Sequence, residues 1–187
     1  MSKTISCVDN TIDSNDVFDR IIDLEIEKED YETQITGLER QYESFKNTFR
    51  EKESIYINWQ ATGDLGLDNQ EYIRFEYEIA GRDLSQVARE LSETTELYEE
   101  WLGEEEGGAE LERLKQLVVN ANLKESKDNI LINFYHFENY ARELANDLYG
   151  IGEGWPFNCI DWDAAADILK FDYRSVEFDG ELFYIRS

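Results

Sequence analysis

Carboxylates are the side chains of this chain with the most evident capacity for chemistry. Between Glu90 and Glu112 the sequence holds ten acidic residues and no basic residue. A carboxylate can act as a general acid or base, bind a hard divalent cation or attract a positively charged surface. Because 43 of the 187 residues are acidic, paired carboxylates arise from composition alone and do not indicate acid–base catalysis. We therefore interpret the acidic stretch as a surface that attracts a basic partner.

The other reactive residue types show no enzymatic arrangement. His136 is the only histidine, and Cys7 and Cys159 stand far apart, so the ligand spacing of a zinc site is missing. Asp161 and Asp163 could bind a divalent cation, but Asp161 is better interpreted as the N-cap of a helix. The sequence contains no glycine-rich phosphate loop. We expect a protein without catalytic activity, cofactor or metal.

The formal net charge of −25 restricts the kinds of partner. Aromatic residues make up 13% of the chain, which is enough apolar material for a folded core. Residues 134–187 carry a net charge of −7 and the rest of the chain −18, so the acid is distributed over folded elements. Such a protein repels nucleic acids and anionic membranes and attracts basic surfaces. The alternative is that the charge only maintains solubility or suits a high-salt cell.

The spacing of the acidic residues favours a binding surface. Residues three or four apart on a helix lie on one face, and like charges at that spacing destabilise the helix by a few tenths of a kcal/mol per pair. A sequence selected for stability alone would interleave lysines, although a merely solvated acidic face remains the alternative. The candidate partner-binding residues are Glu90, Glu93, Glu96, Glu99, Glu100, Glu104, Glu105, Glu106, Asp161, Asp163 and Asp167.

Two series of apolar residues at alternating spacings of four and three predict two long helices with coiled-coil seams. Asp16 is the expected N-cap of the first helix, with Asp13 and Ser14 as competitors. Residues 62–70 form the expected connector, so the helices should fold back as an antiparallel hairpin. The first series is Val17, Ile21, Leu24, Tyr31, Ile35, Leu38, Tyr42, Phe45 and Phe49, interrupted by Lys28 and continued weakly by Tyr56 and Trp59. The second is Ile73, Tyr77, Ala80, Leu84, Val87, Leu91, Thr94, Tyr98 and Trp101.

The rest of the chain predicts shorter elements. Residues 104–108 should end the second helix, and a short third helix follows. A further helix should stop at Gly150, and another should begin at Asp161. The Asp179-Gly180 pair between alternating apolar residues predicts a β-hairpin with a two-residue turn.

These elements predict a mainly α (α+β) fold, in which a long antiparallel helical hairpin accompanies a small C-terminal helical domain that ends in a β-hairpin. The expected domains are a flexible tail at 1–14, an acidic coiled-coil-like hairpin at 15–104, a short helix and connector at 105–132, and an α+β domain at 133–187.

Residues 137–186 resemble the C-terminal region of the ArdA family of antirestriction proteins. The shared features are Tyr140-Ala141-Arg142 on a helix, a glycine near Gly150, a proline near Pro156, Ile160-Asp161-Trp162 with Ala165, and a closing pair of short strands. The chain departs from the family pattern at Asp167-Ile168, near the place of the usual arginine. The helical region 16–103 does not look like the ArdA N-terminal domains.

The resemblance implies an acidic DNA mimic, encoded by a phage or mobile element, that blocks a host defence enzyme in the cytoplasm. The unlike N-terminal part leaves the target open between a restriction–modification enzyme and a CRISPR complex. We expect the partner to be the basic cleft of such an enzyme, with no direct nucleic-acid or membrane binding and with a homodimer as an option. The lack of a basic-then-apolar leader and of long apolar runs also predicts a cytoplasmic location. The alternative function is an acidic coiled-coil adaptor without mimicry.

Overall fold

A computed structural model describes residues 3–63, 67–125, 127–150 and 154–186 of the chain. The protein is mainly α-helical with a small antiparallel sheet, which confirms the predicted fold class. The chain divides into two compact units. Residues 27–103 form the hairpin unit, and residues up to 26 together with residues from 104 onward form the sheet unit. In the described part of the chain, no helix is both long and apolar enough for a membrane span.

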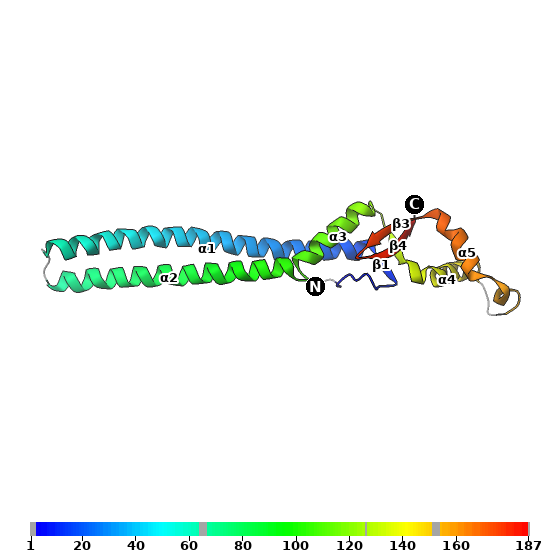
Figure 1. Cartoon of the computed structure of the whole chain (residues 1–187), viewed down its shortest axis with the longest axis horizontal. Helices are drawn as coiled ribbons and strands as arrows, with labels where there is room; N and C mark the ends of the chain where they lie inside the picture. Colours follow the sequence, from blue (N-terminus) through cyan, green and yellow to red (C-terminus); the bar gives the residue numbers. More distant parts are fainter. Residues whose placement is uncertain (1–2, 64–66, 126, 151–153, 187) are drawn as a thin grey trace. The chain divides into compact units, whose positions relative to one another are not determined.

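The hairpin unit consists of two long antiparallel helices, α1 and α2 (Figure 1). α1 spans Ser14–Thr62, of which the residues from 27 onward belong to this unit, and α2 spans Leu67–Gly103. The indole Nε1 of Trp101 donates to the Glu27 carboxylate at 3.2 Å, and Lys52 lies 2.9 Å from the Glu76 carboxylate. The two residues of a contact are closer in sequence for the second pair than for the first, which is typical of an antiparallel hairpin, as the sequence predicts.

The two predicted apolar series face each other across the hairpin. The ring of Tyr77 stacks on that of Tyr56, with centroids 4.7 Å apart, and lies 5.3 Å from the ring of Phe49. Ala80 and Val87 are buried between the helices. Aromatic pairs at such distances add stability beyond the area they bury. The seam therefore fixes which faces of α1 and α2 point to solvent.

The connector between the two helices is shorter than the predicted 62–70. α1 continues to Thr62, α2 begins at Leu67, and residues 64–66 lie outside the described part of the chain. Gly63 has a φ of 62°, and its N–H donates to the carbonyl of Trp59 at 3.0 Å. A glycine in this left-handed conformation is a common end of a helix.

The N-terminus of α1 is capped by a different residue from the one expected. α1 begins at Ser14, and the carboxylate of Asp13 accepts a hydrogen bond of 2.8 Å from the backbone N–H of Asn15. Asp13 therefore satisfies one of the free N–H groups of the first turn. The expectation that Asp16 is the N-cap is wrong, because Asp16 already lies within the first helical turn.

The sheet unit is built around four antiparallel strands in the order β1-β2-β4-β3. Figure 1 labels β1, β3 and β4. Asp179 and Gly180 join the last two strands with positive φ angles of 50° and 82°, which confirms the predicted two-residue turn. The strands are β1 (Thr11–Asp13), β2 (Ile130–Asn133), β3 (Tyr173–Phe178) and β4 (Glu181–Arg186).

Three α-helices of the sheet unit follow the predicted order. Gly150, with a φ of 62°, ends the second of them, and the Asp161 carboxylate accepts from the backbone N–H of Ala164 at the start of the third. Both predicted helix ends are confirmed. The helices are α3 (Gly108–Asn120), α4 (Phe137–Tyr149) and α5 (Trp162–Leu169), with short 3₁₀ turns η1 (Phe134–His136), η2 (Phe157–Cys159) and η3 (Lys170–Asp172).

A small apolar cluster joins the sheet to α4 and α5. Phe137 is fully buried, and Ile132, Ala141 and Ala166 pack with it. The partly buried rings of Tyr140 and Tyr173 lie against this cluster, and their hydroxyl oxygens are 3.0 Å apart. This core holds the C-terminal helices onto the sheet.

A buried ion pair connects α3 to the first turns of α1 within the sheet unit. Arg20 donates to the Glu110 carboxylate from Nη2 at 2.7 Å and from Nε at 3.2 Å. The same carboxylate also accepts from the backbone N–H of Ile5 at 3.3 Å. Glu110 is 1% exposed, so this member of the acidic stretch belongs to the core and not to a surface.

The described residues of the N-terminal segment do not form the loose tail that the sequence predicts over residues 1–14, of which residues 1 and 2 lie outside the described part of the chain. Ile5 and Ile12 are buried, and Ile12 stands opposite Leu131 in the pairing of β1 with β2. A short strand with one apolar residue gives almost no alternating signal, and the pairing partner lies far along the sequence. The tail prediction is therefore wrong for the strand and for the buried Ile5 before it.

The remaining domain boundaries also differ from the predicted ones. The expected connector at 105–132 and the expected C-terminal domain at 133–187 belong to one unit, because β2 pairs with both β1 and β4. The sequence predicts the hairpin over 15–104, but residues 15–26 and Glu104 belong to the sheet unit.

Candidate partner-binding surface of the helical hairpin

One end of the hairpin unit concentrates the acid of both helices. We call residues 27–36 of α1 and 90–103 of α2 the acidic end. These two segments hold nine acidic residues and one basic residue, Lys28. Residues 37–89, the charge-balanced end, hold ten acidic and seven basic residues. The negative charge of the hairpin is therefore polarised toward one end.

Contacts between the helices fix the acidic end. The Tyr98 hydroxyl donates to Glu32 Oε1 at 2.9 Å, and the Trp101 indole donates to Glu27 at 3.2 Å. The ring of Tyr31 stacks on Tyr98, with centroids 5.6 Å apart, and lies 6.0 Å from the ring of Trp101. Two α1 carboxylates are thus held in register with α2 by aromatic side chains of the seam.

The predicted carboxylates of α2 point away from that seam. Glu93, Glu96, Glu99 and Glu100 are exposed, whereas Glu90 is half-buried and accepts from the side-chain amide of Gln86. Since Glu93, Glu96 and Glu100 follow the three- and four-residue spacing of one helix face, their carboxylates form a stripe. The structure thus presents this predicted stripe to solvent.

The carboxylates of the stripe differ in their local partners. Arg89, one turn before Glu93, lies 3.7 Å from its carboxylate, and Ser92 donates to Glu96 at 3.3 Å. An exposed ion pair such as Arg89–Glu93 contributes little to stability. The carboxylates of the stripe therefore remain accessible to the basic side chains of a partner protein.

The close approach of Glu32 also affects the tyrosine at the acidic end. Burial raises the pKa of Tyr98 above its ordinary value of 10.0, and the hydrogen bond and negative charge of Glu32 raise it further. The neutral phenol is therefore the form that fits this position. Its proton remains available to hold the Glu32 carboxylate at neutral pH.

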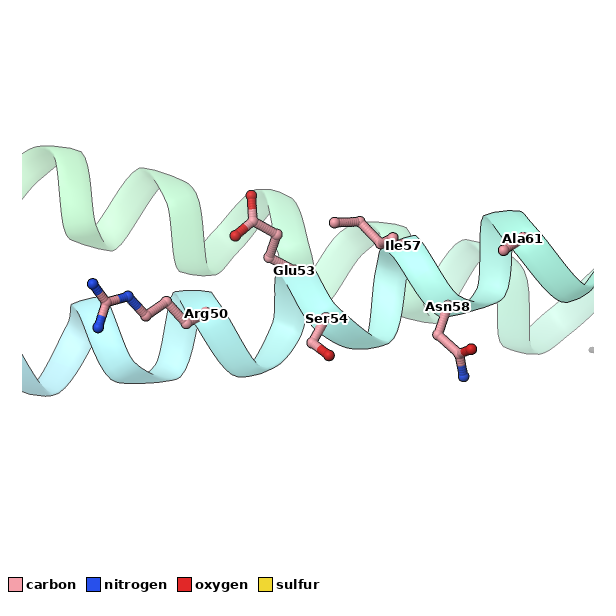
Figure 2. A pocket seen from close by; sticks show the side chains of 6 residues that line it. All are labelled: Arg50, Glu53, Ser54, Ile57, Asn58 and Ala61. Carbon is pink, nitrogen blue, oxygen red and sulfur yellow. The ribbon is translucent and has the colours of Figure 1, made fainter.

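The charge-balanced end has a different surface chemistry. Lys52 pairs with Glu76, which raises the pKa of the lysine, and Arg74 lies 2.8 Å from Glu78. Figure 2 shows a shallow hollow on the outer face of α1, lined by side chains of mixed polarity from Arg50 to Ala61. Four large apolar side chains of this end are between 43% and 61% exposed: Ile55, Ile57, Tyr72 and Phe75.

The other predicted binding residues belong to the sheet unit. Glu104, Glu105 and Glu106 are exposed between α2 and α3, and the carbonyls of Glu105 and Glu106 accept from Arg113 and Arg20. The backbone of this acidic segment is therefore held in place.

The three predicted aspartates of the sheet unit lie on α5 or at its start. Asp161 is the N-cap of α5, Asp163 is exposed in its first turn, and Asp167 pairs with Lys170 at 3.0 Å. Within the described residues, no group of three histidine, cysteine, aspartate or glutamate side chains is placed to hold a metal ion.

Sequence reasoning missed the α1 half of the acidic end. The acids of α1 are Glu27, Glu29, Asp30 and Glu32. The signal was available, because an antiparallel seam with a short loop pairs the start of the first series with the end of the second. No protein-family model, curated protein or solved structure matches this chain.

Proposed function

We propose that this protein is an anti-defence inhibitor, encoded by a phage or mobile element, that occupies the nucleic-acid-binding cleft of a host restriction–modification or CRISPR enzyme. It acts as a DNA mimic in the host cytoplasm and performs no catalysis. The observation that carries the proposal is the acidic end, where two packed helices hold nine acidic residues and only one basic residue, Lys28.

The spacing of these carboxylates suits a cleft that is built for phosphates. Successive turns of a helix are about 5.4 Å apart. The phosphates of one DNA strand also follow one another at a spacing of several ångströms. Arginine and lysine side chains that bind phosphates also form charge-assisted hydrogen bonds with carboxylates. A preformed stripe loses little conformational freedom on binding, because the seam already orders its backbone.

The class of target is supported by the resemblance of residues 137–186 to the ArdA C-terminal region. The resemblance favours the target class of ArdA proteins, which is the type I restriction–modification enzymes. The unlike hairpin leaves room for a different defence nuclease, such as a DNA-cleaving CRISPR effector, so these are the two enzymes to test first.

The experiment compares inhibition of DNA cleavage by the parent protein and by two triple variants. In the first, Glu93, Glu96 and Glu100 become glutamine. In the second, the exposed residues Glu39, Glu51 and Glu71 of the charge-balanced end become glutamine, with the same change in net charge. Loss of inhibition in the first variant alone supports the proposal. Absence of inhibition by the parent, or equal inhibition by all three proteins, contradicts it.

A coiled-coil adaptor without mimicry is the second candidate, favoured by the exposed apolar side chains of the charge-balanced end. Ile57 and Phe75 are 57% and 58% exposed on helices that have no further cover within the hairpin unit. Under this alternative, changing both residues to serine abolishes association with a partner helix or a second copy. Two results would favour the adaptor. Light scattering would show association of the parent but not of this variant, and the glutamine changes would leave binding unaffected.

A further inference from the structure

A hollow of about 310 Å³ in the sheet unit brings together two basic side chains, two tyrosine hydroxyls and one carboxylate. It is lined by residues 127–130 at the start of β2, by Tyr140 of α4, by Tyr173 of β3 and by Arg186 of β4. Tyr173 and Arg186 stand directly opposite each other in the β3–β4 pairing, so their side chains project from the same face of the sheet. The volume lies at the lower end of the range for small-molecule sites.

The two tyrosines offer a hydrogen-bond donor to this hollow. Their hydroxyl oxygens are 3.0 Å apart, and either one can be the donor. Because the shared bond uses only one of the two hydroxyl protons, the other O–H can donate to a ligand. Packing of both rings against the apolar cluster around Phe137 fixes the position of this donor.

The hollow contains two basic side chains, Lys127 and Arg186. Other basic side chains of the chain, such as Lys52 and Arg74, form ion pairs with carboxylates. Among the described residues, neither Lys127 nor Arg186 has a carboxylate oxygen within 4 Å. Asp128 also lines the hollow, and its carboxylate accepts from the side-chain amide of Asn15 at 3.1 Å. Within the part of the chain that the structure describes, two cations without an ion pair therefore line the same hollow.

We propose that this hollow binds a small phosphomonoester. The guanidinium of Arg186 suits two oxygens of the phosphate, Lys127 adds a mobile positive charge, and the free tyrosine O–H donates to a third oxygen. Ile130, which is 48% exposed, and the tyrosine rings provide an apolar wall for the organic group. This site is independent of the acidic end, and its ligand is a small molecule and not a macromolecule.

The test is isothermal titration of the full chain with phenyl phosphate, inorganic phosphate and phenol at constant ionic strength. The expected result is saturable one-to-one binding of phenyl phosphate, weaker binding of inorganic phosphate and none of phenol. Arg186→Gln should weaken phenyl phosphate binding roughly tenfold or more, as expected for the loss of a hydrogen-bonded charge. Arg82→Gln, an exposed arginine of the hairpin unit, is the matched control and should bind as the parent does.

Three results would overturn the proposal: no saturable binding of phenyl phosphate, equal binding of phenol, or unchanged binding by the Arg186→Gln variant. Lys127→Gln provides a second variant, since Lys127 is an exposed side chain whose loss leaves the core intact. Chemical shifts of backbone amides should change at residues 127–130 and around Tyr173. Changes confined to other parts of the chain would also contradict this location.

Discussion

The hydroxyl of Tyr98 on α2 donates a 2.9 Å hydrogen bond to the carboxylate of Glu32 on α1. This bond joins the seam of the hairpin to its acidic surface, because the ring of Tyr98 also stacks on Tyr31. Apolar packing thus positions a carboxylate that is 66 residues away in sequence. The same arrangement recurs at Trp101 and Glu27.

The Tyr98–Glu32 bond predicts a loss of stability at alkaline pH. The folded protein holds the pKa of Tyr98 above 10.0, so the stabilisation is complete below the unfolded pKa and is lost as pH rises through the folded one. Tyr98→Phe cannot ionise, so its free energy of unfolding should fall less than that of the parent between about pH 9 and about pH 11. Urea titrations followed by circular dichroism measure this, with Tyr72→Phe as control. An equal fall in the Tyr98→Phe variant would refute the prediction.

Two glycines within the helices should respond differently to alanine. Gly37 has open space where a Cβ would lie, so Gly37→Ala should stabilise the hairpin by about 1 kcal/mol through helix propensity. At Gly81 the added Cβ would lie 3.2 Å from Cε2 of Phe49, so the ring must shift and the gain should be smaller. Chemical denaturation compares the two variants. A larger gain from Gly81→Ala would show that the helices are not packed this closely.

The buried ion pair makes the stability of the sheet unit sensitive to one glutamate. Glu110→Gln removes the carboxylate that lies 2.7 Å from the buried Arg20 guanidinium, and we expect a loss of about 3–5 kcal/mol. Glu112→Gln, on the exposed side of the same helix, should change the free energy of unfolding by less than about 0.5 kcal/mol. Equal effects of the two changes in a thermal or urea titration would show that Glu110 is not buried.

The first strand should contribute to the core in spite of its length. Ile12 is 2% exposed, so Ile12→Ala should destabilise the sheet unit by about 2–5 kcal/mol. Val8→Ala is the control, since Val8 is 77% exposed. If both variants unfold at the same urea concentration as the parent, the N-terminal segment is a loose tail after all.

Strong local signals in the sequence predicted the elements that depend on nearby residues. The four-and-three spacing gave the seam of the hairpin, Asp179-Gly180 gave the turn between β3 and β4, and Gly150 and Asp161 gave helix ends. Each of these signals involves residues within a few positions of one another, so no knowledge of distant contacts was needed.

The parts that escaped prediction depend on distant partners. β1 has one buried residue, Ile12, and becomes a strand because it pairs with β2 more than a hundred residues later. Glu110 looked like one acid among ten, because its partner Arg20 lies 90 residues away. The α1 half of the acidic end could be inferred from the antiparallel pairing of the two series, and the hydrogen bond of Tyr98 to Glu32 shows which α1 carboxylates lie there.

The most direct test of the proposed mimicry is whether DNA and this protein exclude each other from the same cleft. The apparent dissociation constant for a purified type I restriction–modification enzyme or DNA-cleaving CRISPR effector is measured at increasing concentrations of its DNA substrate. Mimicry predicts that the constant rises linearly with the DNA concentration, and that glutamine at Glu93, Glu96 and Glu100 weakens binding even when no DNA is present. A dissociation constant that DNA leaves unchanged, or no binding to either enzyme, would contradict it.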